Sequence, residues 1–256
     1  MVVPFFNPGP VVRTTVERAA AALAAAGISV EIIAVCDGAT DGSEETLAGV
    51  LPGVLRTVVL PANRGKGFAV RTGMARGRGR LVGFIDADGD IAPEVLPDFV
   101  ETAHRTGADI VFGSKRHRDG QEHAALVRRV SSWGFRIFVR ALFNLSVPDT
   151  QTGVKVLRAE VARAVLPVMR EERYAFDLEL FVLAQRFGHA SFVELPIRVD
   201  KQYTTTVSPQ AASTIVRDTL NIFWRFRVRR YPRSEPRERD PMDPGRGMPA
   251  EDVDPV

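Results

Sequence analysis

Three aspartates occupy alternating positions at the end of an apolar run, in the segment "GFIDADGD" (83–90). The carboxylates of Asp86, Asp88 and Asp90 are close enough in sequence to repel one another unless a cation holds them. Mg²⁺ and Mn²⁺ prefer carboxylate oxygens and keep water ligands that a phosphate can replace. The alternative is a solvated turn, because Asp and Gly are common turn formers. The segment by itself leaves both interpretations open.

Two other segments have a composition that suits a ligand-binding loop. In "VCDGATDGS" (35–43), Asp37 ends an apolar run and two glycines permit tight turns. In "NRGKGFAVRTG" (63–73), Lys66 stands between two glycines where a helix is expected to begin, a position that suits the approach of a phosphate. Each segment has a plain alternative: a turn that ends at Ser43 as a helix N-cap, and an exposed lysine near a helix cap.

The composition is that of a globular protein and excludes several classes of site. Of the 256 residues, 45% are hydrophobic and 25% are charged. A net charge of +3 with a pI near 9.3 favours local basic patches over a general nucleic-acid coat. The single cysteine, Cys36, excludes an internal disulfide and a Cys-rich metal site. We expect neither a signal peptide nor a membrane-spanning helix, because no basic leader and no run of about 18 apolar residues is present.

Apolar runs alternate with helical patterns through the first half of the chain. We expect strands at 2–6, 30–36, 55–60, 80–86 and 109–114, and helices at 11–26, 43–50, 66–76 and 93–106. This alternation predicts an α/β fold with a mostly parallel sheet and helices on both faces. Ligands of such sheets bind beyond the carboxyl ends of the strands, where residues 37–41, 86–90 and 114–117 lie.

The second half is less regular but still predicts ordered elements. We expect helices at 124–146, 175–187 and 209–230, and strands at 154–157 and 191–199. One domain is therefore predicted over residues 1–230. Residues 231–256 are rich in Pro, Arg, Asp and Glu and have almost nothing to bury, so they are expected to form a disordered tail.

The order of the polar motifs resembles a known enzyme family. The series is "VVPFFNP", "VCDGATDGS", "NRGKGFAVRTGM", "FIDADGD", "IVFGSKRH", "DTQTGVKVL", "YAFDLELF" and "ELPIRV". Over about residues 1–230 it resembles the family 2 nucleotide-sugar glycosyltransferases of GT-A fold, and among them the polyprenyl-phosphate (dolichyl-phosphate) glucosyl- and mannosyltransferases. The "DTQTGVK" and "AFDLEL" segments favour the dolichyl-phosphate glucosyltransferase branch. The resemblance implies a metal-dependent, inverting transfer of a hexose.

The resemblance also implies which residues contact the donor. Pro4 and Asn7 line the nucleotide pocket, Asp37 contacts the base, and Lys66 lies near the nucleotide. Asp86 and Asp88 match the acids of a DxD motif, which meet the ribose and the metal-bound diphosphate, with Ala87 between them on the donor side. The expected ligands of Mg²⁺ or Mn²⁺ are Asp88 first, Asp86 next and Asp90 least.

A second group of residues is implied on the acceptor side. Lys115 occupies the place of an arginine in a "GSR" motif and Asp149 is the general base for a hydroxyl acceptor, so that Asp149, Asp88 and Lys115 form the expected catalytic set. For a phosphate acceptor Asp149 is expected to orient groups instead. The expected acceptor contacts are Arg116, Gln151, Lys155, Asp177, Glu179 and Lys201.

The chain departs from the family pattern at the base-recognition turn. Pro8 stands where a glutamate usually follows Asn7, and Cys36 and Ala39 replace an Asp and a Ser of the usual "DDGS" turn. These changes remove carboxylates and a hydroxyl from the nucleotide side. Base recognition is therefore less well defined by the sequence than the metal site.

The resemblance implies three kinds of partner: a nucleotide-sugar donor, a divalent cation and a polyprenyl phosphate. UDP-glucose is the expected donor, with GDP-mannose as the alternative, and a hydroxyl acceptor is a second possibility. A non-enzyme alternative is an inactive nucleotide- or membrane-binding module. Residues 225–230, near Trp224 and Phe226, suit peripheral docking on the cytoplasmic face of an anionic membrane, although the apolar stripe of this helix can also pack on the core. No nucleic acid is expected.

Overall fold

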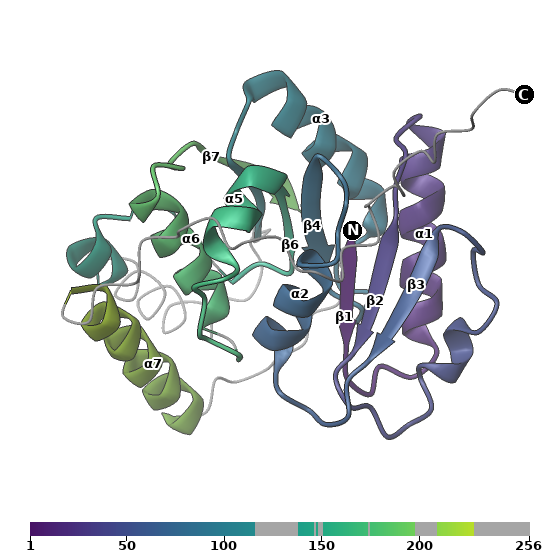
Figure 1. The fold of residues 1–256 in the computed structure, drawn as a ribbon, viewed down its shortest axis with the longest axis horizontal. Helices are drawn as coiled ribbons and strands as arrows, with labels where there is room; N and C mark the ends of the chain where they lie inside the picture. The colour runs from purple at the N-terminus through teal and green to yellow at the C-terminus, as the bar shows by residue number, and fades with distance from the viewer. Residues whose placement is uncertain (116–137, 146, 148–150, 174, 198–208, 228–256) are drawn as a thin grey trace, which may run out of the picture.

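The computed structural model describes residues 1–115, 138–145, 147, 151–173, 175–197 and 209–227. Its strands are β1 (Val2–Phe5), β2 (Ile32–Cys36), β3 (Leu55–Val59), β4 (Leu81–Ile85), β5 (Ile110–Lys115), β6 (Val154–Arg158) and β7 (Phe192–Ile197). Its helices are α1 (Val11–Ala25), α2 (Lys66–Met74), α3 (Leu96–Thr106), α5 (Ala159–Val165), α6 (Phe176–Arg186) and α7 (Pro209–Arg227), with 3-10 turns at Glu45–Leu47 and Pro93–Val95. Figure 1 shows how they surround the sheet.

The strands form one sheet in the order β3-β2-β1-β4-β6-β5-β7. All neighbours pair in parallel except β6, which is antiparallel to both β4 and β5. The register of β4 with β6 places Val154 opposite Ile85, so the amino end of β6 lies beside the carboxyl end of β4. The reversal of β6 therefore brings residues 151–153 to the edge of the sheet where ligands are expected.

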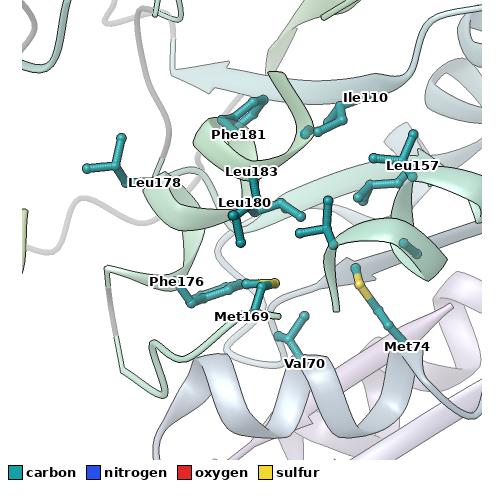
Figure 2. Close-up of a cluster of buried hydrophobic side chains, with 14 of the residues drawn as sticks. Val70, Met74, Ile110, Leu157, Met169, Phe176, Leu178, Leu180, Phe181 and Leu183 are labelled. Carbon is teal, nitrogen blue, oxygen red and sulfur yellow. The ribbon is translucent and has the colours of Figure 1, made fainter. Parts of the chain in front are cut away.

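Both faces of the sheet are covered, as the sequence predicted. Alternate residues of β2 enter two different cores: Ile33 and Val35 join the side chains of α2, α5 and α6, whereas Ile32, Ala34 and Cys36 join those of α1 and α3. In Figure 2, Val70 and Met74 of α2 lie beneath Phe176 and Met169 in the first of these cores. Central strands buried on both faces read as continuous apolar runs, which explains why β1 and β2 were recognisable.

Several element predictions differ from the structure in detail. The helix expected at 43–50 is only the 3-10 turn Glu45–Leu47, and 93–106 divides into a 3-10 turn and α3. The sequence did not predict α5, because seven residues give too short a periodic pattern. Most of the helix expected at 124–146 lies outside the described residues, which include a helical stretch at 138–143. Residues 231–256 also lie outside the described part, so the disordered tail and the domain boundary stay predictions.

Helix α7 packs on the α6 side of the molecule. Phe143 makes edge-on ring contacts with Phe223 and Phe226 of α7, at centroid distances of 5.9 and 6.0 Å. Arg225 forms an ion pair with Glu171 and approaches Glu179 at 3.9 Å. Arg225 and Phe226 therefore face the protein, and the expected contact of residues 225–230 with a membrane stays a prediction. Each described helix is too short or too polar to cross a bilayer.

Candidate active site

Asp37 follows β2 and is almost completely buried. Its two carboxylate oxygens accept the backbone N–H groups of Arg64, at 2.9 Å, and Gly65, at 2.7 Å. Gly65 has a φ of 109°, and a Cβ there would lie 2.5 Å from the carbonyl oxygen of Glu172, so only glycine fits. Asp37 thus fixes the turn from which α2 begins, and little of its carboxylate is open to a ligand.

Lys66, the first residue of α2, pairs with the first acid of the Asp86–Asp88 motif. The Lys66 Nζ lies 2.6 Å from Asp86 Oδ1 and 2.7 Å from Oδ2, and the two side chains are 22% and 24% exposed. Burial by itself lowers the pKa of Lys66, but the carboxylates of Asp86, Asp177 and Asp88 together outweigh it and raise the pKa above its usual value. The positive charge of Lys66 thus balances the negative charge of the Asp86 carboxylate.

Gly153 lies against Asp86, on the β6 side of the aspartate. The Asp86 N–H donates to the carbonyl oxygen of Gly153 at 2.9 Å, and a Cβ on Gly153 would collide with the Asp86 carboxylate. This role of Gly153 was not predicted. The sequence signal that pointed to it was a glycine directly before the short apolar run of β6, where close backbone approach is common.

Asp88 presents the most open carboxylate of the three aspartates. It is exposed, and its Oδ1 accepts the N–H of Asp90 at 3.0 Å. Ala87 is buried in the core on the α1 side, and its carbonyl oxygen accepts the Thr15 hydroxyl of α1 at 3.2 Å. An exposed carboxylate beside a lysine-paired one suits a hard cation such as Mg²⁺ or Mn²⁺, with room for water or phosphate oxygens.

The loops after β1 and β2 are joined to each other. Asn7, at a φ of 50°, accepts the N–H of Thr40 at 2.8 Å, and the Gly9 N–H donates to Asp41 Oδ2 at 2.9 Å. Pro4 is buried within β1, whereas Phe6, just after the carboxyl end of the strand, is 49% exposed. The sequence did not single out Phe6, although an aromatic residue between Pro4 and Asn7 was the available signal.

The residues expected on the acceptor side are mostly buried where they are described. Lys155 is 0% exposed, and its Nζ lies 2.6 Å from Asp177 Oδ1 and donates to the Thr152 carbonyl oxygen at 2.8 Å. Burial raises the pKa of Asp177, although Lys155 and Lys66 oppose the shift. Glu179 accepts the N–H groups of Arg170 and Glu171, at 2.9 and 2.7 Å. Gln151 is exposed.

The remaining predicted residues cannot be placed as side chains. Lys115 ends β5, at the same edge of the sheet as Asp86 and Asp88, because β5 and β4 are both antiparallel to β6. Arg116, Asp149 and Lys201 lie outside the described residues.

A different acid and histidine cluster lies at the opposite edge of the sheet. Among the described residues, Asp109, Glu160 and His189 are the group of three whose ligand atoms all lie within 4.8 Å of one another. Asp109 Oδ2 accepts the Ser191 N–H at 3.0 Å, and Oδ1 lies 3.3 Å from His189 Nδ1. These contacts join the starts of β5 and β7, so this cluster is separate from Asp86 and Asp88.

Comparisons with known proteins agree with the resemblance. A family model described as "Glycosyl transferase family 2" matches residues 1–166. The chain is 33% identical over 172 residues to the dolichyl-phosphate beta-glucosyltransferase of Dictyostelium discoideum, covering 62% of this chain and 52% of that protein. It is 29% identical over 168 residues to the dodecaprenyl-phosphate galacturonate synthase of Rhizobium johnstonii, covering 64% and 49%. The chain thus spans about half the length of these relatives.

A solved structure gives the same fold at low sequence identity. The glucosyl-3-phosphoglycerate synthase of Mycobacterium tuberculosis, in complex with Mn²⁺, UDP and glucosyl-3-phosphoglycerate, superimposes with a TM-score of 0.66 at 18% identity, covering 86% of this chain and 78% of that one. The predicted family and the predicted GT-A fold, with its mostly parallel sheet, are confirmed.

Proposed function

The chain belongs to glycosyl transferase family 2, and from this premise we propose that it transfers a hexose from a nucleotide-sugar donor to a polyprenyl phosphate with inversion at the sugar carbon. The observation that carries the proposal is the placement of Lys66, Asp86 and Asp88 together at the carboxyl ends of the parallel strands. The names of the two relatives support a polyprenyl phosphate acceptor. Glucose from UDP-glucose is the proposed donor sugar, with GDP-mannose as the alternative.

The donor side must neutralise a diphosphate leaving group. Asp88, with Asp86 next, would hold Mg²⁺ or Mn²⁺, which when bound offsets negative charge on the departing diphosphate. Lys66 keeps Asp86 fixed and adds a positive charge at the same edge of the sheet. Because the turn at Asp37 and the carbonyl of Gly153 fix these groups before the donor arrives, little reorganisation is needed during the reaction.

The acceptor side requires cations more than it requires a strong base. A phosphate monoester has a second pKa of about 6 and is largely dianionic at pH 7, so it is nucleophilic without losing a proton. Lys115, Arg116, Lys201 and Gln151 are the proposed contacts of the lipid phosphate. Asp149 is the proposed general base if the acceptor is a hydroxyl, and an orienting residue if it is a phosphate.

The test is a screen of radiolabelled nucleotide sugars with polyprenyl phosphate as the acceptor. Label that passes into organic solvent only when Mg²⁺ or Mn²⁺ and the lipid are both present would support the proposal. Label retained in water with a glycan acceptor would favour a hydroxyl acceptor instead. Calorimetry with UDP and GDP, with and without Mn²⁺, distinguishes the two enzyme hypotheses from the inactive module. Absence of metal-dependent nucleotide binding would exclude both enzyme hypotheses.

Phe6 is the proposed stacking surface for the nucleobase. Replacing Phe6 with Ala should weaken binding of UDP in the presence of Mn²⁺ by about tenfold, because base–aromatic stacking is worth about 1–3 kcal/mol. Phe6→Tyr should bind as the parent does, since it keeps the ring. Calorimetry measures both, and an unchanged Kd for Phe6→Ala would remove Phe6 from the base site.

The outer face of α7 is the proposed membrane contact. Trp224 is 59% exposed and Leu220 lies one turn before it, with Arg217 and Arg227 exposed on the same helix. Trp224→Ser should reduce binding to phosphatidylglycerol vesicles about tenfold, because burial of an aromatic side chain in the interface is lost. The matched control is Val59→Ser, which removes an equally exposed apolar side chain from β3. Sedimentation with vesicles measures the binding of both variants. Equal binding of Trp224→Ser and Val59→Ser would contradict the proposal.

A further inference from the structure

Two lysine–aspartate pairs lie beside the ring of Phe84 in β4. The Nζ atoms of Lys66 and Lys155 are 5.4 and 5.0 Å from the centroid of the ring. Lys66 pairs with Asp86 and is partly open to solvent, whereas Lys155 and Asp177 are 0% and 4% exposed. The second pair is therefore in no position to meet an acceptor, and its presence in the core needs a different explanation.

Stability alone does not explain a buried ion pair. Removing two charges from water costs about as much as their attraction returns, and apolar residues of similar volume often stabilise a protein at least as well. A buried pair is better explained where it fixes the arrangement of neighbouring groups. The pair at Lys155 and Asp177 has two such neighbours.

The first neighbour is the segment before β6. Lys155 donates to the carbonyl oxygen of Thr152, which holds the chain back towards the core just before β6 begins. The next residue is Gly153, whose carbonyl accepts the Asp86 N–H and whose missing Cβ leaves space for the Asp86 carboxylate. In the register of the sheet, Lys155 is opposite Phe84, two residues before Asp86.

The second neighbour is the start of α2. Asp177 follows Phe176 at the beginning of α6, and the Phe176 ring contacts Phe84 at a centroid distance of 5.7 Å. A Cβ on Gly67 would lie only 2.6 Å from the Cβ of Phe176, so α6 packs directly against the residue after Lys66. The pair thus ties together the backbone that carries Asp86 and the backbone that carries Lys66.

We propose that Lys155, Asp177 and Gly153 form a positioning bracket that holds Asp86 against Lys66 at the donor site. These residues act through Asp86 and touch neither substrate. The inference rests on the proposed function only in taking Asp86 and Lys66 as the donor side. It assigns Lys155 and Asp177 to the donor half of the reaction, in place of the acceptor contact that the resemblance implied.

The test is the double variant Lys155→Met with Asp177→Asn, which removes both charges and keeps similar side-chain volumes. Either single change leaves one buried charge uncompensated and is expected to lower the unfolding temperature sharply. The double variant should unfold within a few degrees of the parent and should bind UDP with Mn²⁺ about tenfold more weakly, as is common when residues that support a binding group are lost. The KM for the donor should rise, and the KM for the polyprenyl phosphate should not.

A second measurement is independent of nucleotide binding. Amide hydrogen exchange at Asp86 should be about tenfold faster in the double variant, because the hydrogen bond to Gly153 opens more often. The matched control is Asp109→Asn, which weakens a buried carboxylate contact at the opposite edge of the sheet. It should lower stability without changing exchange at Asp86 or the Kd for UDP.

The outcomes separate the bracket from the proposed function. Unchanged exchange at Asp86 in the double variant would overturn the bracket, as would a rise in the acceptor KM alone. Absence of UDP and GDP binding by the parent protein would remove the proposed function, and the exchange measurement would still decide the bracket.

Discussion

Replacing Asp88 with asparagine is expected to lower the rate of sugar transfer by about a hundredfold or more, the usual loss when a group that stabilises developing charge is removed. Metal-dependent binding of UDP should weaken in parallel, because the amide is a poorer ligand for Mg²⁺ and Mn²⁺ than the carboxylate. The fold should survive, since the side chain is exposed and the asparagine oxygen can still accept the N–H of Asp90.

The control for this variant is Glu101→Gln, which neutralises an exposed acid on α3. It should leave the transfer rate and the Kd for UDP unchanged. Calorimetry with a Mn²⁺ titration, followed by the radiolabel assay, measures both quantities. Full activity of Asp88→Asn would show that the cation, if one is used, is bound elsewhere.

Replacing Gly153 with alanine is expected to have a comparable effect although no functional group is removed. The new Cβ would occupy the space of the Asp86 carboxylate, so Asp86 must move away from Lys66 or the start of β6 must shift. A displacement of about 1 Å at a reacting centre can lower a rate by about a hundredfold. The donor KM should rise together with the loss of rate, because both the position and the charge pairing of Asp86 change.

Gly77→Ala is the matched control for Gly153→Ala. Gly77 follows α2, and a Cβ there would lie 3.2 Å from a methyl group of Val82 and 3.3 Å from the Met74 carbonyl oxygen, near the amino end of β4. It should change stability slightly and leave nucleotide binding unchanged. If Gly153→Ala bound UDP as tightly as the parent, the absence of a Cβ at residue 153 would not be needed to position Asp86.

The position of the expected donor residues at one edge of the sheet was predictable, because it depends on sequence order and on strand direction. Asp37 and Asp86 each end an apolar run, and parallel strands bring such ends to one edge of a sheet. Lys66 was expected at the same edge because it stands between two glycines at the start of α2, directly after the next parallel strand, β3. Asp88, the first of the expected metal ligands, has an exposed carboxylate, and its role stays a prediction.

The burial of most residues expected on the acceptor side was less predictable, because it depends on contacts between distant segments. Lys155 lies between apolar residues, and a lysine is seldom buried, so exposure was the reasonable expectation. Its burial depends on Asp177, which is 22 residues further along the chain and in another element. Arg225 is a similar case, since Glu171 turns it away from solvent.

The sequence by itself determined the α/β class, the places of the seven strands, the family, and the residues that line the carboxyl edge of the sheet. These features follow from local apolar periodicity and motif order, which are properties of the chain alone. Only the tertiary structure decided that β6 runs antiparallel between β4 and β5, that Gly153 therefore lies against Asp86, and that Lys155 and Asp177 form an ion pair in the core. The physical reason is that strand register and the compensation of a buried charge depend on partners far apart in the sequence, which meet only when the sheet and α6 pack together.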